Sequence, residues 1–343
     1  MPDEKIKVPV NPSIREYKGE YAVRWEESRS SRYKEYRRKW VENPKKFVLG
    51  DGPINLDIES TNYCNLKCPM CPRTVLVRDN VPVNGGKYEL GFIDRSLYEN
   101  LIDQAAEIGV EALKLNWLGE PTMHRNLADM VRYAKKKGII DVLINTNGVL
   151  LDEKLATGLI EAGVDKLLFS FDSPFREDYE KIRVGANFDR VLENIRNVNR
   201  IRGRLGKDTP LTRASMVLMK ENASQFKDFL ELFKDIVDIV ACTDKELIGD
   251  EIKTAKREKI KDFACAQLWQ RMLITWDGKV AVCCNDARME YVVGDATKED
   301  LRSIWKGEKY RYIREKHMSG RYNEVPICGK CDIAEYDEKP DRK

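Results

Sequence analysis

Three closely spaced cysteines are the residues of this sequence best suited to chemistry. They occur in the segment Cys64-Asn-Leu-Lys-Cys68-Pro-Met-Cys71, directly after a short apolar run, so one loop carries all three thiols. Three thiolates leave one iron of a four-iron cluster without a side-chain ligand, and an open iron can bind and activate a small molecule. A zinc knuckle would need a fourth ligand, yet no further Cys or His lies within 50 residues of this segment.

Four more cysteines form a second group. Cys265 is followed by twelve residues, a glycine, four residues and Cys283, and a Cys-X-X-Cys pair, Cys328 and Cys331, comes later. Four thiolates can close the coordination shell of one metal or one cluster, and the spacing alone fits a zinc ribbon as well as an iron–sulfur cluster. Cys284 is expected to point the other way along a strand and to be a buried spare.

Composition excludes several classes of protein. The 60 basic and 57 acidic residues nearly balance at a net charge of +3, so the chain lacks the strong field of a nucleic-acid binder. The polar start of the chain is no signal peptide, and no apolar run approaches the roughly 20 residues that span a bilayer. Nine cysteines without a secretion signal indicate a reducing compartment. We expect a cytoplasmic protein that binds neither nucleic acid nor membrane.

The elements that must position these cysteines alternate between β-type and helical patterns. Amphipathic stretches separate six short strands, which indicates βα units and a parallel sheet. The expected strands are Ile54–Ser60, Leu113–Trp117, Val142–Asn145, Lys166–Phe171, Arg213–Leu218 and Ile236–Ala241. The sequence therefore predicts an α/β fold, a partial (β/α)6 barrel that binds ligands at the carboxyl ends of its strands.

An N-terminal extension precedes this barrel. Residues 14–41 carry aromatic side chains at three- or four-residue spacing, which predicts a helix or helix pair packed on the main domain. In a second interpretation the segment is a lid that grips substrate through Arg29, Arg32 or Arg37.

The C-terminal region reads as a small separate domain. Two apolar runs flank Asp277-Gly278, which predicts a β-hairpin, and a helix is expected over Lys298–His317. The predicted division of the chain is a helical extension (1–50), a barrel (51–245) and an auxiliary domain (246–343).

The first cysteine segment, after a strand that opens six βα units, resembles that of the radical S-adenosylmethionine (SAM) superfamily. The resemblance runs from about Asn55 to Cys331. It implies that Cys64, Cys68 and Cys71 hold a 4Fe-4S cluster whose open iron binds SAM, and that reduction cleaves SAM to a 5′-deoxyadenosyl radical. A reducing partner such as flavodoxin or ferredoxin is implied as the electron source.

The same resemblance assigns residues to SAM along the first two strands. Met70 stands where the family usually has an aromatic residue, and its backbone is implied to contact adenine. Gly119-Glu120 resembles a Gly-Gly-Glu element in which Glu120 or its neighbouring backbone accepts from the SAM ammonium. The first glycine of that element is Leu118 here.

Later strands add further implied contacts. Ser170 and Asp172 stand where the family places groups that bond the ribose hydroxyls, and Arg183 resembles the arginine that pairs with the SAM carboxylate. Asn145 and Asn147 end the third strand and face the cavity by position.

The second cysteine group resembles the auxiliary-cluster module of radical SAM enzymes. A full SPASM domain would add cysteines after Cys331, and none follows, so the short version called a twitch domain is implied. This resemblance implies one auxiliary 4Fe-4S cluster held by Cys265, Cys283, Cys328 and Cys331. Four thiolates close such a cluster, which suits electron transfer or structural support.

Three reactions follow from these resemblances. The auxiliary spacing is most similar to that of twitch-type aminocyclitol dehydrogenases, so oxidation of a secondary alcohol in a sugar, aminocyclitol or nucleotide-sugar is the leading hypothesis. A radical epimerase of a carbohydrate is the alternative, with Cys242 donating a hydrogen atom, and peptide (RiPP) modification is the third. Asp244 and Glu246 are candidate bases or substrate contacts. A non-enzymatic electron carrier or zinc scaffold is the remaining interpretation.

Overall fold

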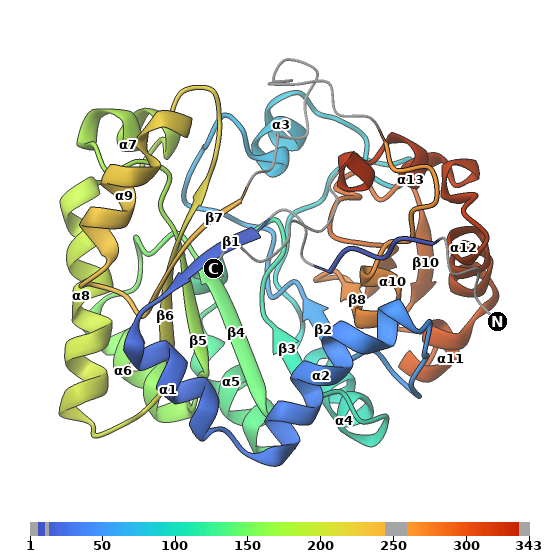
Figure 1. Cartoon of the computed structure of the whole chain (residues 1–343), viewed down its shortest axis with the longest axis horizontal. Helices are drawn as coiled ribbons and strands as arrows, with labels where there is room; N and C mark the ends of the chain where they lie inside the picture. Colours follow the sequence, from blue (N-terminus) through green and yellow to red (C-terminus); the bar gives the residue numbers. More distant parts are fainter. Residues whose placement is uncertain (1–5, 11–13, 244–258, 336–343) are drawn as a thin grey trace.

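The computed structural model describes residues 6–10, 14–243 and 259–335. Six parallel strands form its centre and confirm the predicted α/β class and partial barrel: β2 (Asn55–Ile58), β3 (Ala112–Lys114), β4 (Asp141–Thr146), β5 (Lys166–Ser170), β6 (Leu211–Val217) and β7 (Ile239–Thr243). Helices connect them: α3 (Pro72–Arg78), α4 (Arg95–Glu107), α5 (Leu127–Lys136), α6 (Glu153–Ala162), α7 (Arg176–Ile182), α8 (Phe188–Arg204) and α9 (Phe226–Phe233). The sheet does not close on itself (Figure 1).

The two faces of this sheet differ in burial. On β4, Val142 and Ile144 are completely buried in the main core, which lies between the sheet and its helices. The alternate residues of the strands face inward and are mostly polar and partly exposed: Leu143, Asn145, Ser170, Arg213, Ser215 and Val217. Because parallel sheets are usually apolar on both faces, this polar and accessible inner face marks the side that meets ligands.

A strand comes before the predicted helix pair. Residues 14–18 form β1 (Ile14–Lys18), which pairs antiparallel with β7, so the prediction of a helix from residue 14 is wrong there. Without β1, the edge of β7 would present unpaired backbone groups to solvent. The helices follow as α1 (Glu20–Ser28) and α2 (Ser31–Lys45).

The helices α1 and α2 close the amino end of the barrel. Four of their aromatic side chains pack against residues at or just before the starts of the strands: Trp25, Tyr33, Tyr36 and Trp40 contact a cluster with Ile54, Ala112, Leu211 and Ile239. We call these four aromatic residues the aromatic plug. A buried ion pair lies beneath it, with Lys166 Nζ 2.7 Å from Asp141 Oδ2. Tyr36 donates to Asp141 at 3.1 Å, and Lys166 donates to the Tyr33 hydroxyl at 2.9 Å.

The lid interpretation of this extension is wrong. Arg29 pairs with Asp208 and Arg32 pairs with Glu111, two acidic residues that precede strands. Arg37 donates to the Tyr36 hydroxyl at 3.3 Å. All three arginines therefore lie at the amino end of the barrel, whereas a substrate lid would have to cover the carboxyl ends.

The C-terminal strands continue the barrel sheet instead of standing apart. Strand β8 (Arg271–Ile274) follows α10 (Gln267–Gln270) and pairs in parallel with β2. The predicted hairpin joins β8 to β9 (Lys279–Ala281), and β10 (Val292–Asp295) follows at the edge. The strand order is β1-β7-β6-β5-β4-β3-β2-β8-β9-β10.

The helix predicted over 298–317 is two helices. They are α11 (Leu301–Lys306) and α12 (Glu308–Met318), which meet at an extended Gly307. A Cβ atom at Gly307 would lie 2.9 Å from the Ser303 carbonyl oxygen, so the break requires glycine. A short helix, α13 (Pro326–Lys330), carries Cys328.

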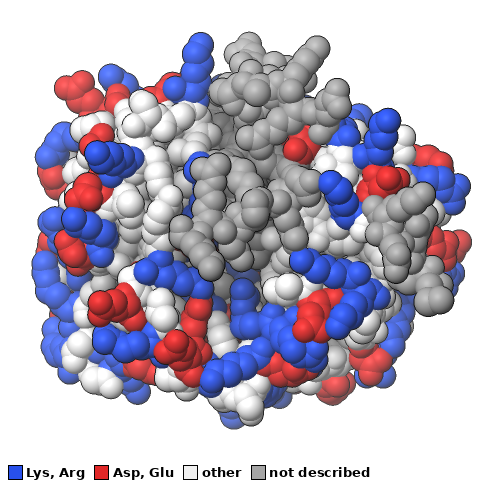
Figure 2. All heavy atoms as spheres, viewed as in Figure 1, with Lys and Arg blue, Asp and Glu red and all other residues white. Residues whose placement is uncertain are grey.

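The surface carries both signs of charge. Figure 2 shows Lys and Arg interspersed with Asp and Glu around the described part of one face. Among the described residues, none of the helices combines the length and the apolar character needed to cross a membrane.

The ion pair beneath the aromatic plug yields a test of stability. Asp141→Asn leaves the Lys166 ammonium buried without a counter-charge, so we expect the free energy of unfolding to fall by about 3–5 kcal/mol. The double variant Asp141→Asn/Lys166→Met should recover part of this loss, whereas the exposed control Lys154→Met should change little. Anaerobic urea denaturation measures all three. A full, additive loss in the double variant would contradict the buried pair.

Candidate active site

The loop between β2 and α3 holds the first three cysteines. Cys68 is 6% exposed, and Cys64 and Cys71 are partly buried. The backbone N–H of Cys71 donates to the Cys68 carbonyl at 3.1 Å, and the N–H of Leu66 donates to Cys64 Sγ at 3.4 Å. Helix α3 starts directly after Cys71 with a proline at its first position, which suits a sharp start. All three thiols therefore share one loop at the carboxyl end of β2.

The surroundings of these thiols suit a bound metal cluster, because a cluster would stabilise the thiolate form. Burial raises the pKa of Cys64 to about 11 and also raises the pKa of Cys68, so without metal these thiols stay protonated at neutral pH. The nearby Arg183 guanidinium opposes that rise at Cys68. Iron binds thiolates, so loading a cluster here releases protons, and a donor such as the Leu66 N–H stabilises the bound sulfur.

Gly119 packs directly on the strand that leads into the cysteine loop. A Cβ atom there would lie 2.0 Å from the Thr61 carbonyl oxygen, which no side chain tolerates. The next residue, Glu120, donates its N–H to the Tyr63 carbonyl at 2.8 Å. This close approach joins the loop after β3 to the loop that carries Cys64.

The Glu120 carboxylate is fully engaged by the protein. Its Oε1 accepts from the hydroxyls of Thr122 and Thr146 at 2.6 and 2.7 Å, and its Oε2 accepts from the Asn147 N–H at 2.7 Å. Burial raises its pKa. The predicted contact of Glu120 or its neighbouring backbone with the SAM ammonium stays a prediction.

Residues that end β4 and β5 border the same region. The Asn147 side-chain amide donates to Asn65 Oδ1 at 2.9 Å and lies 4.0 Å from Cys64 Sγ. The side chains of Asn145 and Ser170 are partly exposed on the inner face. Met70, just before Cys71, is also partly exposed. The contacts of these residues with SAM stay predictions.

Asp172 and Arg183 form an ion pair beside the cysteine loop. Arg183 Nε lies 2.6 Å from Asp172 Oδ2, and Asp172 Oδ1 accepts from the Val217 N–H at 2.9 Å. Asp172 is completely buried with both oxygens engaged. Its predicted role toward the ribose stays untested, and its contacts show that it fixes Arg183 next to Cys68.

The second group of cysteines meets beyond β8 and β9. The N–H of Cys265 donates to His317 Nδ1 at 3.1 Å, and Asn285 donates to Cys331 Sγ at 3.5 Å. Burial raises the pKa of Cys265, and the nearby thiolates of Cys331 and Cys328 raise it further. Cys283 responds to the same neighbours. The four predicted ligands thus face a common space.

The second group of cysteines differs in two respects from a closed metal site with Cys284 buried beside it. No group of three or more His, Cys, Asp or Glu among the described residues is arranged to hold a metal ion as it stands. Cys284 is not the buried spare that was predicted, because β9 ends at Ala281 and the thiol is partly exposed, 3.4 Å from Gln267 Oε1. It lies close enough to raise the pKa of Cys265 and Cys283.

Sequence reasoning missed Glu59, which joins the segment after β3 to the turn after β8. It is 1% exposed, and its Oε1 accepts from the Leu118 N–H at 3.1 Å. The Trp276 N–H, in the turn after β8, also bonds it, and burial raises its pKa to about 7. The signal was present in the alternation Leu-Asp-Ile-Glu over β2 and the residue that follows it, which places two acids on the inner face.

Of the three candidate catalytic residues, the structure describes Cys242 alone. Cys242 on β7 is completely buried in the main core, and its register partner on β6 is Met216, also in that core. Because neighbours in register share a face, its thiol points to the helices and away from the inner face. Asp244 and Glu246 lie outside the described residues.

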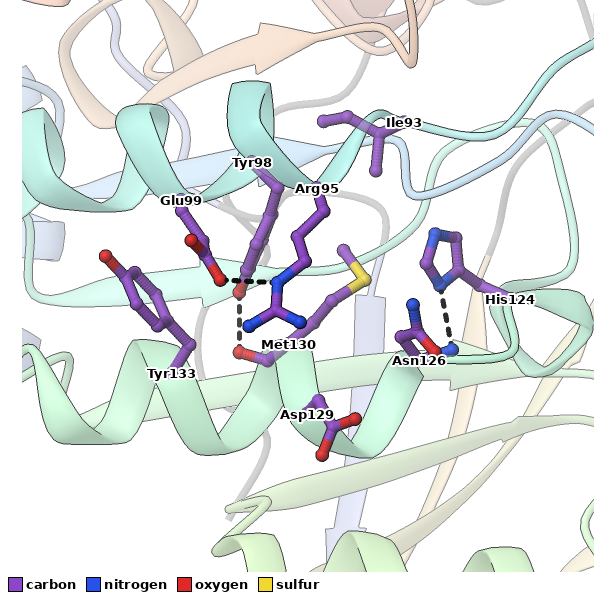
Figure 3. Close-up of a pocket in the computed structure, with 9 residues that line it drawn as sticks. All are labelled: Ile93, Arg95, Tyr98, Glu99, His124, Asn126, Asp129, Met130 and Tyr133. Carbon is purple, nitrogen blue, oxygen red and sulfur yellow. Dashed lines mark hydrogen bonds and ion pairs between the residues drawn. The ribbon is translucent and has the colours of Figure 1, made fainter.

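A pocket elsewhere on the surface does not belong to this site. It lies between α4 and α5, with Arg95, His124 and Asp129 among its lining residues (Figure 3). Arg95 pairs with Glu99 at 2.8 Å, and Tyr98 donates to the Met130 carbonyl at 2.7 Å. Asp129 is paired with Arg132, outside the lining, so these polar groups already have partners in the protein.

Two groups of thiols on one sheet, one on the loop after β2 and one from the segments around β8, β9 and α13, indicate an iron–sulfur protein. A family model described as the radical SAM superfamily matches residues 58–233, more than half of the chain, and the chain belongs to that superfamily. A second model, an iron-sulfur cluster-binding domain, matches residues 265–332. The protein binds SAM and two 4Fe-4S clusters, one for SAM and one auxiliary.

Similarity to individual proteins is lower. A tungsten-containing aldehyde ferredoxin oxidoreductase cofactor-modifying protein of Pyrococcus furiosus is 26% identical over 81% of this chain and 87% of its own length. A GTP 3',8-cyclase of Lactiplantibacillus plantarum is 32% identical, but the match spans 58% of this chain and 56% of the cyclase. The matches to two other cyclases, of Limosilactobacillus fermentum and Metallosphaera sedula, likewise span 57% and 52% of their length.

Solved structures show the same fold. BtrN in complex with AdoMet and 2-DOIA has a TM-score of 0.53 and 19% identity, over 81% of this chain and 92% of BtrN. Streptococcus suis SuiB bound to S-adenosylmethionine has a TM-score of 0.59 and 18% identity, over 83% of this chain and 74% of SuiB.

Gly119 offers a test of the contact between the two loops. Gly119→Ala forces the loop after β3 away from Thr61, so we expect SAM affinity, measured by equilibrium dialysis, to fall by at least about tenfold. Gly158→Ala in α6 is the matched control, because a Cβ there lies 3.7 Å from the nearest atom and alanine favours helix. Equal SAM affinity in wild type and Gly119→Ala would show that the close approach does not shape the SAM site.

Iron content tests the assignment of the cysteines. Anaerobic reconstitution should load about eight irons per chain, and replacing Cys64, Cys68 and Cys71 together by Ala should leave about four, because each cubane holds four. Iron and zinc analysis with visible absorption measures this. Complete loss of iron in the triple variant, or one zinc in the wild type, would contradict two independent clusters.

Proposed function

We propose that the protein oxidises a secondary alcohol of a polar small molecule, such as a sugar, aminocyclitol or nucleotide-sugar, by radical dehydrogenation in the cytoplasm. The observation that carries the proposal is the inner face of the barrel, which is polar, partly exposed and closed at its amino end by the aromatic plug. Such a surface suits a substrate with many hydroxyl or amine groups. Flavodoxin or ferredoxin is the proposed electron donor.

The proposed reaction removes one hydrogen atom, one proton and one electron from a CH–OH group and leaves a ketone. When bound, SAM and its cluster supply the abstracting radical, and the auxiliary cluster supplies an acceptor for the second electron. The polypeptide orients the alcohol on the inner face and excludes water from the amino end. Asp244 or Glu246 is the proposed acceptor of the proton.

The surroundings of Cys242 favour dehydrogenation over epimerisation. An epimerase must return a hydrogen atom to the substrate carbon, and Cys242 is the one cysteine within the strands β2 to β7. Its burial among the core residues of the outer face supports a packing role. Peptide modification is also less well supported, because α1 and α2 pack on the strand starts and leave no separate peptide-binding unit among the described residues.

A second candidate function is modification of a cofactor. The relative from Pyrococcus furiosus is matched over 87% of its length, against 56% for the cyclase of Lactiplantibacillus plantarum, and is named for modifying the cofactor of a tungsten-containing oxidoreductase. A cofactor with hydroxyl groups would also fit a polar inner face. Incubation with the cofactor extracted from such an enzyme, followed by mass spectrometry, distinguishes this candidate from free sugars and cyclitols.

Products formed in D2O test the dehydrogenase proposal. Reduced, reconstituted protein with SAM and a panel of sugars, aminocyclitols and nucleotide-sugars should form 5′-deoxyadenosine together with a ketone that has lost two hydrogen atoms. Cys242→Ala should keep this turnover, because the side chain lies in the core on the outer face of the sheet, away from the inner face. A product of unchanged mass apart from one solvent deuterium, lost in Cys242→Ala, would instead establish an epimerase.

A further inference from the structure

One lysine on the inner face stands out from the other cations there. Lys114 on β3 is partly buried and lies in register with Asp57 on β2 and Leu143 on β4. Among the described residues, no carboxylate lies within ion-pairing distance of its ammonium group. A partly buried ammonium without a counter-charge is costly unless a ligand supplies one.

The neighbouring inner-face cations all have acidic partners. Arg213 Nη1 is 2.8 Å from Glu16 Oε1, and Lys166 is paired with Asp141 beneath the aromatic plug. Arg271 lies 3.6 Å from Asp57 Oδ2. Lys114 therefore differs from cations whose charge is already compensated.

Asp57 is not available to Lys114 either. Its Oδ1 accepts from the Asn55 side chain at 2.7 Å and its Oδ2 faces Arg271, so the carboxylate turns away from Lys114 toward β8. Asp57 is 1% exposed, whereas Lys114 is accessible on the inner face.

Polar groups continue from Lys114 toward the SAM site. Asn116 uses its side-chain oxygen to accept from the Asn145 N–H at 3.1 Å, and no described residue accepts from its amide nitrogen. The side chains of Asn145 and Ser170 follow on β4 and β5. Asn116 is the second residue after Lys114, which corresponds to about 7 Å along an extended chain. An oxyanion at Lys114 would thus lie about the length of one sugar ring from Asn116.

We propose that Lys114 binds an oxyanion, a phosphate or carboxylate group, on the end of the substrate remote from the reacting carbon, while the amide of Asn116 contacts its hydroxyl groups. The proposal rests on the proposed function and narrows its substrate to an acidic or phosphorylated polyol. Charge-assisted contacts of this kind are about twice as strong as neutral ones and fix the orientation of a ligand.

Anion binding to the holoenzyme tests this subsite directly. Titration calorimetry of the reconstituted protein with inorganic phosphate, and separately with malonate, should detect a site that weakens by at least about tenfold in Lys114→Met. Lys114→Arg should bind within about threefold of wild type because the charge remains. Lys154→Met, on the exposed surface of α6, should bind as wild type. The tighter of the two anions distinguishes a phosphate from a carboxylate group.

The alternative outcomes separate the subsite from the reaction. Binding of neither anion, or equal binding by wild type and Lys114→Met, would overturn the subsite even if a ketone forms from a neutral substrate. Loss of binding in both Lys114→Met and Lys114→Arg, with normal iron content and melting temperature, would also overturn it, since charge would not be what is recognised. Intact anion binding without ketone formation would instead overturn the dehydrogenase proposal and leave the subsite standing.

Discussion

The packing of the aromatic plug against the starts of the parallel strands is the contact on which the remaining architecture depends. The outer face of the sheet is apolar and is covered by the helices, whereas the inner face is polar and partly exposed. Trp25, Tyr33, Tyr36 and Trp40 bury that face at its amino end, and the Asp141–Lys166 pair beneath them is compensated within the protein. The inner face therefore opens toward the carboxyl ends, where the cysteine loop lies.

The same geometry organises the residues that are predicted to surround SAM. Gly119 permits the loop after β3 to approach Thr61, and Glu120 then bonds the ends of the neighbouring segments through Thr146 and Asn147. The Asp172–Arg183 ion pair, from the segment that follows β5, places the Arg183 guanidinium near Cys68. These contacts are made between segments that follow four different strands, so the site is held by the order of strands in the sheet and not by any one loop.

Features with a strong local signal could be predicted from the sequence. The six parallel strands follow from repeated apolar runs, and the cysteine groups and the Asp277-Gly278 hairpin follow from spacing and turn chemistry. Features set by tertiary pairing could not. Residues 14–18 form a strand because they pair with the edge of β7, which is distant in the sequence. The break at Gly307 depends on a close approach to a carbonyl group that periodicity does not reveal. The predicted strand ended at Ala241, whereas β7 continues to Thr243. Cys242 therefore lies within the strand, and the alternation of side chains along it sets the direction of the thiol.

The parallel pairing of β8 with β2 makes the barrel and the auxiliary region parts of one sheet. The loop with Cys64 follows β2, and β9, whose end leads to Cys283, returns along β8, so neighbouring strands carry the two thiol groups. Glu59 joins the segments after these strands by accepting from the N–H groups of Leu118 and Trp276. The auxiliary region is thus not a removable module. A chain that ended before β8 would expose the backbone edge of β2 together with its apolar residues, and such an edge invites pairing with other chains and aggregation.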